Sequence, residues 1–252
     1  MDISKIPAGK NLPHDMNVVI EIPFQSDPVK YEIDKDSGAM FVDRFLHTAM
    51  FYPANYGFVP HTISDDGDPV DVIVIGRTPV VPGAVLRSRP IGALVMEDEA
   101  GMDEKIIAVP VDGLHPYYTD VHSFRQLPQV LLDQIAHFFT HYKDLEEGKW
   151  ARIVRWAEAR EAEQLIVDGH NNAQSRKKTA EIVKKAKKLK AIKKGEAKPH
   201  PMPEGIAHAH TPADSGGPVG VPGPMSAPGG AASAEKPAPV ETATRKAMAT
   251  GK

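Results

Sequence analysis

The sequence has 252 residues, of which 41% are hydrophobic, with a formal net charge of −3 and no cysteine. This composition allows a packed core and excludes disulfides, thiolate metal sites and a cysteine nucleophile. No apolar run approaches the roughly 20 residues of a membrane span, and the first residues lack the pattern of a secretory signal, so we expect a soluble, cytoplasmic protein.

Charged and aromatic residues are distributed unevenly along the chain. Residues 1–175 carry a net charge of −12, residues 176–198 a net charge of +9, and residues 199–252 no net charge. All 16 aromatic residues lie between Phe24 and Trp156. The hydrophobic core must therefore lie in the first of these three parts.

The boundaries of this uneven distribution predict three regions. We expect a folded domain over residues 1–170 and a basic, helical extension over 171–198, because the second stretch is rich in lysine. Residues 199–252 contain 10 Pro and 8 Gly and no aromatic residue, so they cannot bury enough apolar area to offset chain entropy. We predict a disordered tail there.

The first half of the chain has the pattern of strands. Turn residues occur at 36–38, and Ala100-Gly101 predicts the turn of a hairpin. Runs of β-branched and apolar residues predict strands over 18–22, 31–34, 70–75, 91–96 and 106–111.

Helix signals come late in the sequence. Pro128 begins a helix whose apolar stripe includes Leu131, Ile135, Phe138 and Tyr142. Further helices are predicted over 157–167 and, as a basic helix, over 176–194, with a break at 169–172 between them. Strands followed by helices predict an α+β fold, with a small barrel or twisted sheet and helices packed beside it.

Residues 65–71 place four carboxylates within seven positions. Like charges at this density raise one another's pKa, and a divalent cation relieves the conflict. Asp71 is predicted to share a strand face with Ile73 and Ile75, where a carboxylate needs a partner or a metal. Oxygen ligands favour Mg²⁺ over Zn²⁺. The alternative is a solvated acidic turn in which Asp71 caps or forms a salt bridge.

Two further charged sets accompany this segment. In the acidic run 97–105, Asp103 and Lys105 are expected on one face, although the run alone is also typical of an exposed hairpin tip. The other set comprises Glu21, Lys30, Glu32, Arg44 and Lys143. Each of these residues is alternatively interpreted as an ordinary surface charge. Carboxylates for Mg²⁺ together with Lys and Arg for phosphate oxygens are what phosphoryl transfer requires, and no P-loop motif is present.

His137 and His141 lie four residues apart on the helix predicted after Pro128. Phe138 occupies the position that a glutamate holds in zinc proteases with His pairs of this spacing. A helix-face or subunit-contact role is therefore favoured over zinc binding.

The motif Asp66-Gly67-Asp68-Pro69-Val70-Asp71 matches the D-x-D-P-x-D signature of the family I soluble inorganic pyrophosphatases. The resemblance to the bacterial branch covers about residues 1–160, in the expected order. Its other motifs are Pro7-Ala8-Gly9-Lys10, Val19-Ile20-Glu21-Ile22-Pro23, Lys30-Tyr31-Glu32, Asp43-Arg44, Phe51-Tyr52-Pro53-Ala54-Asn55-Tyr56-Gly57, Asp98-Glu99-Ala100-Gly101 and His141-Tyr142-Lys143-Asp144.

This resemblance implies a fold, an activity and a set of cofactors. It implies a five-stranded, OB-like β-barrel with flanking α-helices, with residues 1–170 as the catalytic domain. It implies hydrolysis of pyrophosphate to two orthophosphates with several Mg²⁺ ions per site, and Mn²⁺ or Zn²⁺ as substitutes. It also implies a homo-oligomer, a hexamer in bacterial relatives, for which the helix bearing His137 and His141 is a candidate contact.

The same resemblance implies roles for particular residues. Asp68 would be the general base, and Glu32 and Tyr52 would support the site. The metal ligands would be Glu21, Asp66, Asp71, Asp98 and Asp103. The substrate-binding residues would be Lys30, Arg44, Tyr56, Lys105, Tyr142 and Lys143, the first three of them catalytic as well.

Two other hypotheses remain open from the sequence. The lysine-rich segment is expected either to bind a polyanion, such as nucleic acid, polyphosphate or an anionic membrane, or to fold against the acidic domain of its own chain. The chain is alternatively an inactive relative that serves as a binding module. Such a protein would be expected to lose at least one of five residues that are intact here, namely Asp68, Asp71, Lys30, Arg44 and Lys143.

Overall fold

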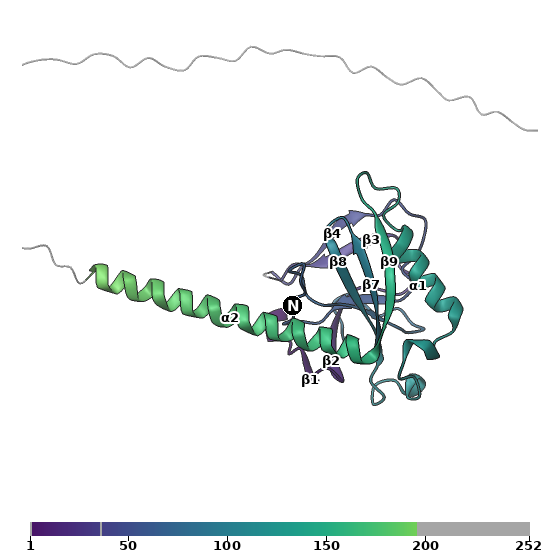
Figure 1. Ribbon diagram of the computed structural model, residues 1–252, viewed down its shortest axis with the longest axis horizontal. Coiled ribbons are helices and arrows are strands. Elements are labelled where there is room, and N and C mark those ends of the chain that lie inside the picture. Colours follow the sequence, from purple (N-terminus) through teal and green to yellow (C-terminus); the bar gives the residue numbers. More distant parts are fainter. Residues whose placement is uncertain (1, 36, 196–252) are drawn as a thin grey trace, which may run out of the picture. The chain divides into compact units, whose positions relative to one another are not determined.

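The computed structural model describes residues 2–35 and 37–195, which all lie within one compact unit, Met1–Lys198 (Figure 1). The disorder predicted for residues 199–252 lies outside the described residues. In the part of the chain that is described, no helix is both long enough and apolar enough to cross a membrane.

Eight of the nine strands in the described chain precede the first α-helix, as predicted. The strands are β1 (Gly9–Asn11), β2 (Asp15–Ile22), β3 (Val29–Ile33), β4 (Met40–Phe45), β5 (Asn55–Phe58), β6 (Asp71–Val74), β7 (Val85–Asp98), β8 (Gly101–Pro110) and β9 (Ala151–Glu158). The α-helices of the described chain are α1 (Gln129–His141) and α2 (Ala159–Gly195), and short 3₁₀ turns lie at Ile3–Lys5, Pro116–Tyr118 and Phe124–Gln126.

Seven strands form one mixed sheet in the order β1-β2-β5-β6-β8-β7-β9. Because β2 also pairs with β7, strands β2, β5, β6, β8 and β7 are joined in a closed ring. The pairing of β6 with β8 is parallel and the other pairings are antiparallel. Strands β3 and β4 form a separate two-stranded sheet. The predicted α+β class, a mixed sheet with helices beside it, is confirmed.

The alternation of side chains along β6 divides the core between two helices. Ile73 belongs to a cluster that also contains Phe138 of α1, whereas Val72 belongs to a second cluster that contains Ile166 of α2. Figure 1 shows the two helices against the sheet, with the distal half of α2 extending away from it. Asp71, one pleat before Ile73, therefore lies on the face of β6 that packs toward α1.

Most of the predicted strands and turns are confirmed. The runs 18–22, 70–75, 91–96 and 106–111 coincide largely with β2, β6, β7 and β8, and the run 31–34 overlaps β3. The predicted hairpin at 100–101 is the β7–β8 connection, in which Gly101 has φ +128°. The remaining strands, β1, β4, β5 and β9, were not predicted.

The predicted second helix begins two residues later than expected. Ala157 belongs to β9, where it pairs with Ala93 of β7, and α2 begins at Ala159. Small apolar residues such as Ala157 fit a helix as well as a strand, so the pairing with β7 decides the structure here.

The predicted break at 169–172 is wrong, because α2 continues without interruption from Ala159 to Gly195. Gly169 serves close packing instead. A Cβ atom at this position would lie 2.6 Å from Cγ2 of Val70. The glycine therefore lets the helix approach the strand and the loop that carries the acidic segment.

Candidate active site

The centre of the candidate site is the ammonium group of Lys105, which is buried between β6 and β8. Its Nζ atom lies 2.9 Å from Oδ2 of Asp71 and 3.0 Å from Oδ2 of Asp103. It also donates a hydrogen bond of 3.1 Å to the hydroxyl of Tyr56, which itself donates to Asp71. The parallel register pairs Asp71 with Lys105, so the fold brings residues 34 positions apart to one level.

Charge interactions decide the protonation of this centre. Burial acts to lower the pKa of Lys105, but the charges of Asp71 and Asp103 outweigh it and raise that pKa well above its usual value. Burial and the nearby charge of Asp71 likewise raise the pKa of the Tyr56 hydroxyl. The lysine therefore stays charged and the tyrosine stays neutral across physiological pH.

The acidic loop approaches this centre from the start of β6. Gly67 has φ +97°, a left-handed conformation that glycine adopts without strain, and the turn lets the backbone N–H of Asp68 donate to Oδ1 of Asp66 at 2.9 Å. Burial, together with the charges of Asp68, Asp103 and Asp71, raises the pKa of Asp66. The loop thus concentrates negative charge beside Lys105, although Asp68 itself remains largely exposed.

Helix α2 anchors the segment that leads into this loop. The backbone N–H of Ile63 donates to the carbonyl of Gly169 at 2.9 Å, and Nδ1 of His170 lies 3.1 Å from the carbonyl of His61. The side-chain amide of Asn172 also reaches the carbonyl of Ile63, at 3.4 Å. The residues predicted to break the helix therefore hold the acidic loop in place.

Glu21 lies near the end of β2 with a buried carboxylate. Its Oε1 accepts a hydrogen bond of 2.8 Å from the backbone N–H of Ile33. Burial is the main cause that raises its pKa to about 8, and the charges of Asp71 and Glu32 add to the effect. The charged form of a buried carboxylate with a raised pKa is stabilised when a cation binds close to it.

Strands β3 and β4 contribute a second group of cations. Lys30 and Arg44 are paired in register across the two strands, and the carboxylate of Asp43 lies 3.3 Å from Nζ of Lys30 and 3.2 Å from Nη1 of Arg44. Lys30 also pairs with Glu32, and Nε of Arg44 lies 3.1 Å from Oε2 of Glu146. Burial acts to lower the pKa of Lys30, but its pairing with Glu32 raises that pKa above the usual value.

Lys143 lies just after α1 and reaches the end of β7. Its Nζ atom donates to Oδ2 of Asp98 at 2.6 Å and lies 3.3 Å from Oε2 of Glu99. Burial acts to raise the pKa of Asp98, but the hydrogen bond from Lys143 outweighs it and lowers that pKa. Tyr142 and Tyr52 are buried beside this group, where Tyr52 packs against Phe138 at 4.7 Å between ring centroids.

The structure brings the sequence-predicted residues into one electrostatically connected cluster. Beside the effects of burial, the charge of Asp71 adds to the rise in the pKa of Glu21, and the charge of Lys105 adds to the lowering of the pKa of Asp98. Sequence reasoning missed Glu99 and Glu146 as partners of Lys143 and Arg44. Glu99 lies within a motif already noted, but Glu146 follows no motif and only the structure identifies it.

The donor atoms of this cluster suit a hard cation. Burial and the charges of Asp68, Asp103 and Asp71 raise the pKa of Asp66, as expected where like charges lie close together. Carboxylate oxygens are the ligands that Mg²⁺ prefers. Among the described residues, however, no group of three or more His, Asp or Glu side chains is already arranged as a metal site, and Lys105 lies between Asp71 and Asp103.

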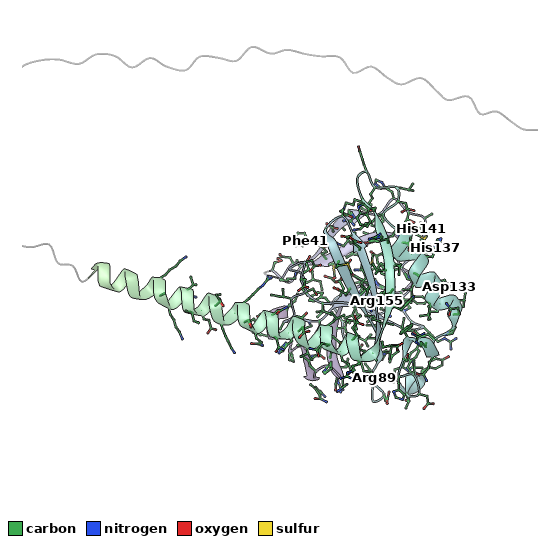
Figure 2. The ribbon with its side chains drawn as sticks, viewed as in Figure 1. Phe41, Arg89, Asp133, His137, His141 and Arg155 are labelled. Atoms are coloured by element: carbon green, nitrogen blue, oxygen red, sulfur yellow. The ribbon has the colours of Figure 1, made fainter. Side chains whose placement is uncertain are left out.

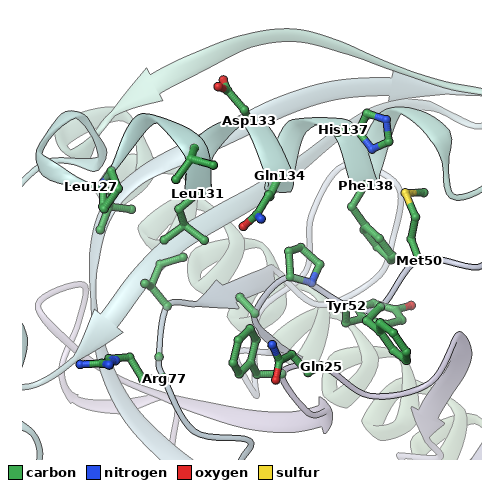
Figure 3. Close-up of a pocket in the computed structure, with 18 of the residues that line it drawn as sticks. Gln25, Met50, Tyr52, Arg77, Leu127, Leu131, Asp133, Gln134, His137 and Phe138 are labelled. Atoms are coloured by element: carbon green, nitrogen blue, oxygen red, sulfur yellow. The ribbon is translucent and has the colours of Figure 1, made fainter. Parts of the chain in front are cut away.

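A cavity of about 910 Å³ lies on the other side of Tyr52, between α1 and the loops at 24–25 and 50–54 (Figure 3). Its lining includes Met50, Phe51, Leu131, Gln134 and His137. The cavity is mainly apolar and contains none of the charged pairs described above. It is therefore separate from the acidic cluster.

Comparison with known proteins identifies the family. A family model described as inorganic pyrophosphatase matches residues 18–174. The chain belongs to this inorganic pyrophosphatase family. It is 66% identical over 166 residues to an inorganic pyrophosphatase of Caulobacter vibrioides and 64% identical over 169 residues to that of Rhodospirillum rubrum. These matches cover 66% and 67% of this chain and 94% of each relative.

A solved structure supports the same conclusion. The crystal structure of an inorganic phosphatase from Anaplasma phagocytophilum is 49% identical in sequence and superimposes with a TM-score of 0.66, covering 68% of this chain and 99% of the other. The resemblance inferred from the sequence is therefore confirmed. The family match ends at residue 174, inside α2, where the basic part of the helix begins.

Proposed function

We propose that this pyrophosphatase-family chain hydrolyses pyrophosphate to two orthophosphates with Mg²⁺ at the cluster around Asp71. The observation that carries this proposal is a buried lysine ammonium that contacts two carboxylates, with further carboxylates and cations around it. A tetra-anionic substrate that binds with metal ions needs both signs of charge in one site. We further propose that the closed ring of strands is an OB-like barrel, as the family resemblance implies.

The carboxylates are the proposed metal-holding part of the site. Bound Mg²⁺ would lower the pKa of water and withdraw charge from phosphate oxygens. Burial that raises the pKa of Glu21 favours a cation beside it, and Mn²⁺ or Zn²⁺ would substitute on the same oxygen donors. The residues assigned to metal binding are Glu21, Asp66, Asp71, Asp98 and Asp103.

Asp68 is the proposed general base. Its side chain is 78% exposed, and Nζ of Lys35 lies 3.6 Å from its Oδ1 atom. An exposed carboxylate at the edge of the cluster is able to accept a proton from the attacking water and to pass it to solvent. Its backbone N–H donates a hydrogen bond to Oδ1 of Asp66, which fixes the loop that carries both residues.

The cations are the proposed phosphate-binding part of the site. Carboxylate partners hold Lys30, Arg44 and Lys143 in place before substrate binds, so little reorganisation is needed to face phosphate oxygens. Tyr56 and Tyr142 remain neutral, because burial raises the pKa of each, and can donate hydrogen bonds. Glu32 supports Lys30 by pairing with it, and Tyr52 supports α1 by packing on Phe138.

The proposal is tested by phosphate release from pyrophosphate by the purified protein, with Mg²⁺ and with EDTA. We expect rapid release that depends on Mg²⁺ and is abolished by Asp71→Asn. Asp65→Asn is the matched control, because Asp65 lies in the same loop but is not among the residues assigned to metal or substrate, and it should retain most of the activity. A folded protein that releases no phosphate with Mg²⁺ would refute the proposal and favour a binding module.

We also propose a homo-oligomer, a hexamer by family resemblance, with α1 at a subunit contact. Val130 and Phe51, at the edge of the cavity, are 64% and 56% exposed. His137 and His141 lie one turn apart on the same helix (Figure 2), 4.7 Å between ring centroids. Light scattering after size-exclusion chromatography tests this, and Val130→Asp should shift the protein toward smaller species if α1 is buried between subunits.

A further inference from the structure

The distal half of α2 presents a dense set of positive charges. Residues 175–187 of this helix are exposed, and the next eight continue it to Gly195. Figure 2 shows this part of the helix extending beyond the sheet, with side chains projecting on both sides of it. The exposed cations in the described side chains are Arg176, Lys177, Lys178, Lys184, Lys185 and Lys187.

These cations are not neutralised by the acidic domain. Within the described side chains, Lys177 contacts Nδ1 of His61 at 2.9 Å, and no ion pair joins residues 176–187 to a carboxylate of the domain. The acidic residue of this stretch, Glu181, stands against six positive charges. Within the residues that the structure describes, the positive charge of this stretch is therefore not balanced by carboxylates of the domain.

The spacing of the charges suits a polyanion with regularly repeated charges. Ten Lys or Arg residues occur in the 19 residues 176–194, which as a helix extend about 28 Å at about 1.5 Å per residue. Double-stranded nucleic acid carries one phosphate charge per about 1.7 Å of its axis. A helix of this length and charge density can therefore contact several phosphates at once.

We propose that this basic segment, 176–194, binds double-stranded nucleic acid through its phosphate backbone and without sequence specificity. Lysine predominates, and lysine acts as a point charge on phosphates, whereas base readout depends mainly on bidentate side chains such as arginine and asparagine. No aromatic residue follows Trp156, so the segment offers no surface on which the bases of a single strand would stack. These two features favour a duplex over a single strand.

A membrane surface is the less suited partner. Helices that lie in a membrane interface need a broad apolar face, usually with aromatic residues. The segment holds four large apolar residues, Ile182, Val183, Leu189 and Ile192, against ten Lys or Arg residues, and it holds no aromatic residue. The apolar surface is therefore small relative to the charge.

The proposal gives the extension a place in a reaction sequence. Nucleotidyl transfer onto a growing nucleic acid releases pyrophosphate, and its removal drives that polymerisation forward. A hydrolase held on the duplex would consume this product where it forms. This consequence rests on the proposed function, whereas binding to the duplex does not.

The test measures fluorescence anisotropy of a labelled 30-base-pair DNA of arbitrary sequence with the full-length protein. The test variant carries Lys178→Gln, Lys184→Gln, Lys185→Gln and Lys187→Gln. The matched control removes four exposed charges elsewhere, with Lys5→Gln, Lys10→Gln, Arg125→Gln and Arg160→Gln. Circular dichroism checks that each variant keeps its helix content.

We expect binding in the micromolar range at low salt, with affinity that falls steeply as salt rises. The test variant should bind at least tenfold more weakly, and the slope of log affinity against log salt should decrease in magnitude by about 0.9 for each phosphate that the variant no longer neutralises. The control should bind like the wild type. Pyrophosphate hydrolysis in free solution should be equal in all three, because none of these residues belongs to the site.

Three results would overturn the proposal. These are equal affinity of the test variant and the control, tighter binding to a single strand of the same length, and tighter binding to vesicles that contain anionic lipid. Absence of hydrolysis in the wild type would refute the proposed function while leaving the binding result intact, so the two failures are distinguishable.

Discussion

Lys105 is the buried cation at the centre of the site. Its side chain is 4% exposed and it faces two carboxylates, so its removal leaves both without their common partner. We expect Lys105→Met to lower the free energy of unfolding by about 3–5 kcal/mol. Urea denaturation checks this, with Lys5→Met as the control, because Lys5 pairs with Asp2 at 3.0 Å but is 81% exposed and should change stability by less than about 1 kcal/mol. Equal decreases in the two variants would contradict the buried pairing.

The buried carboxylate of Glu21 favours metal binding, but without metal its charged form destabilises the folded protein. Its pKa in the folded protein is about 8, above the usual 4.5, so the folded state holds a proton there that the unfolded state releases. This contribution is complete below about pH 4.5 and is lost as pH rises through 8. In EDTA, Glu21→Gln should therefore be more stable than the wild type by about 2–4 kcal/mol at pH 8.5 and equally stable at pH 4.5.

The measurement is urea denaturation of both proteins at the two pH values and at one protein concentration. The glutamine keeps an acceptor for the N–H of Ile33, so the comparison isolates the charge. The same variant should need more Mg²⁺ for half-maximal activity. A wild type that is as stable as Glu21→Gln at pH 8.5 would show that the carboxylate is not desolvated.

At the scale of elements, α2 positions the acidic loop. A Cβ at Gly169 would lie 2.6 Å from Cγ2 of Val70, so Gly169→Ala should displace the helix from the loop and raise the Mg²⁺ concentration for half-maximal activity several-fold. Gly113→Ala is the matched control, since an added Cβ there meets no atom within 4 Å. Val70→Ala added to Gly169→Ala should restore Mg²⁺ affinity. If Gly169→Ala leaves the Mg²⁺ dependence of activity unchanged, the close packing of α2 at this position does not control Mg²⁺ binding at the site.

Local patterns predicted the long strands and the acidic motif because each is defined by neighbours in the sequence. The alternation in β6 placed Asp71 on the face of Ile73, and the structure shows that face packing toward α1. Strands β5 and β9 were missed because long-range pairing, rather than local composition, holds them in the sheet. The break at 169–172 was predicted wrongly because the sequence alone does not distinguish a glycine that permits close packing inside a helix from a glycine that ends one.

The family motifs supplied the composition of the site, and the structure adds its pairings. Sequence spacing does not show that Lys105 meets both Asp71 and Asp103, since this depends on the parallel register of β6 and β8. It also does not reveal Glu146, which reaches Arg44 from a turn 102 residues later. Partners of this kind become visible only when the chain is folded.

At the scale of the whole molecule, hydrolysis and the extension are expected to be separable. The family match ends at residue 174, and the anchoring contacts of His170 and Asn172 lie before that point. Truncation after Gln174 removes the interaction of Lys177 with His61 but keeps this anchor, so turnover per site should stay within about twofold of the full chain. Steady-state phosphate release checks this. A tenfold decrease in turnover would show that the residues after Gln174 contribute to the active site.

The closed ring of strands has a consequence for how the protein is made. Closure requires β2 to meet β7, and β7 in turn pairs with β9, so no partial chain that stops before residue 158 contains the whole sheet. Sheets built on such distant pairs fold slowly, in about milliseconds to seconds. The sequence continues for 78 residues past Gln174, and at about 5–20 residues per second their translation takes roughly 4–16 seconds. The emerging domain thus has time to complete its ring while the ribosome still holds the chain.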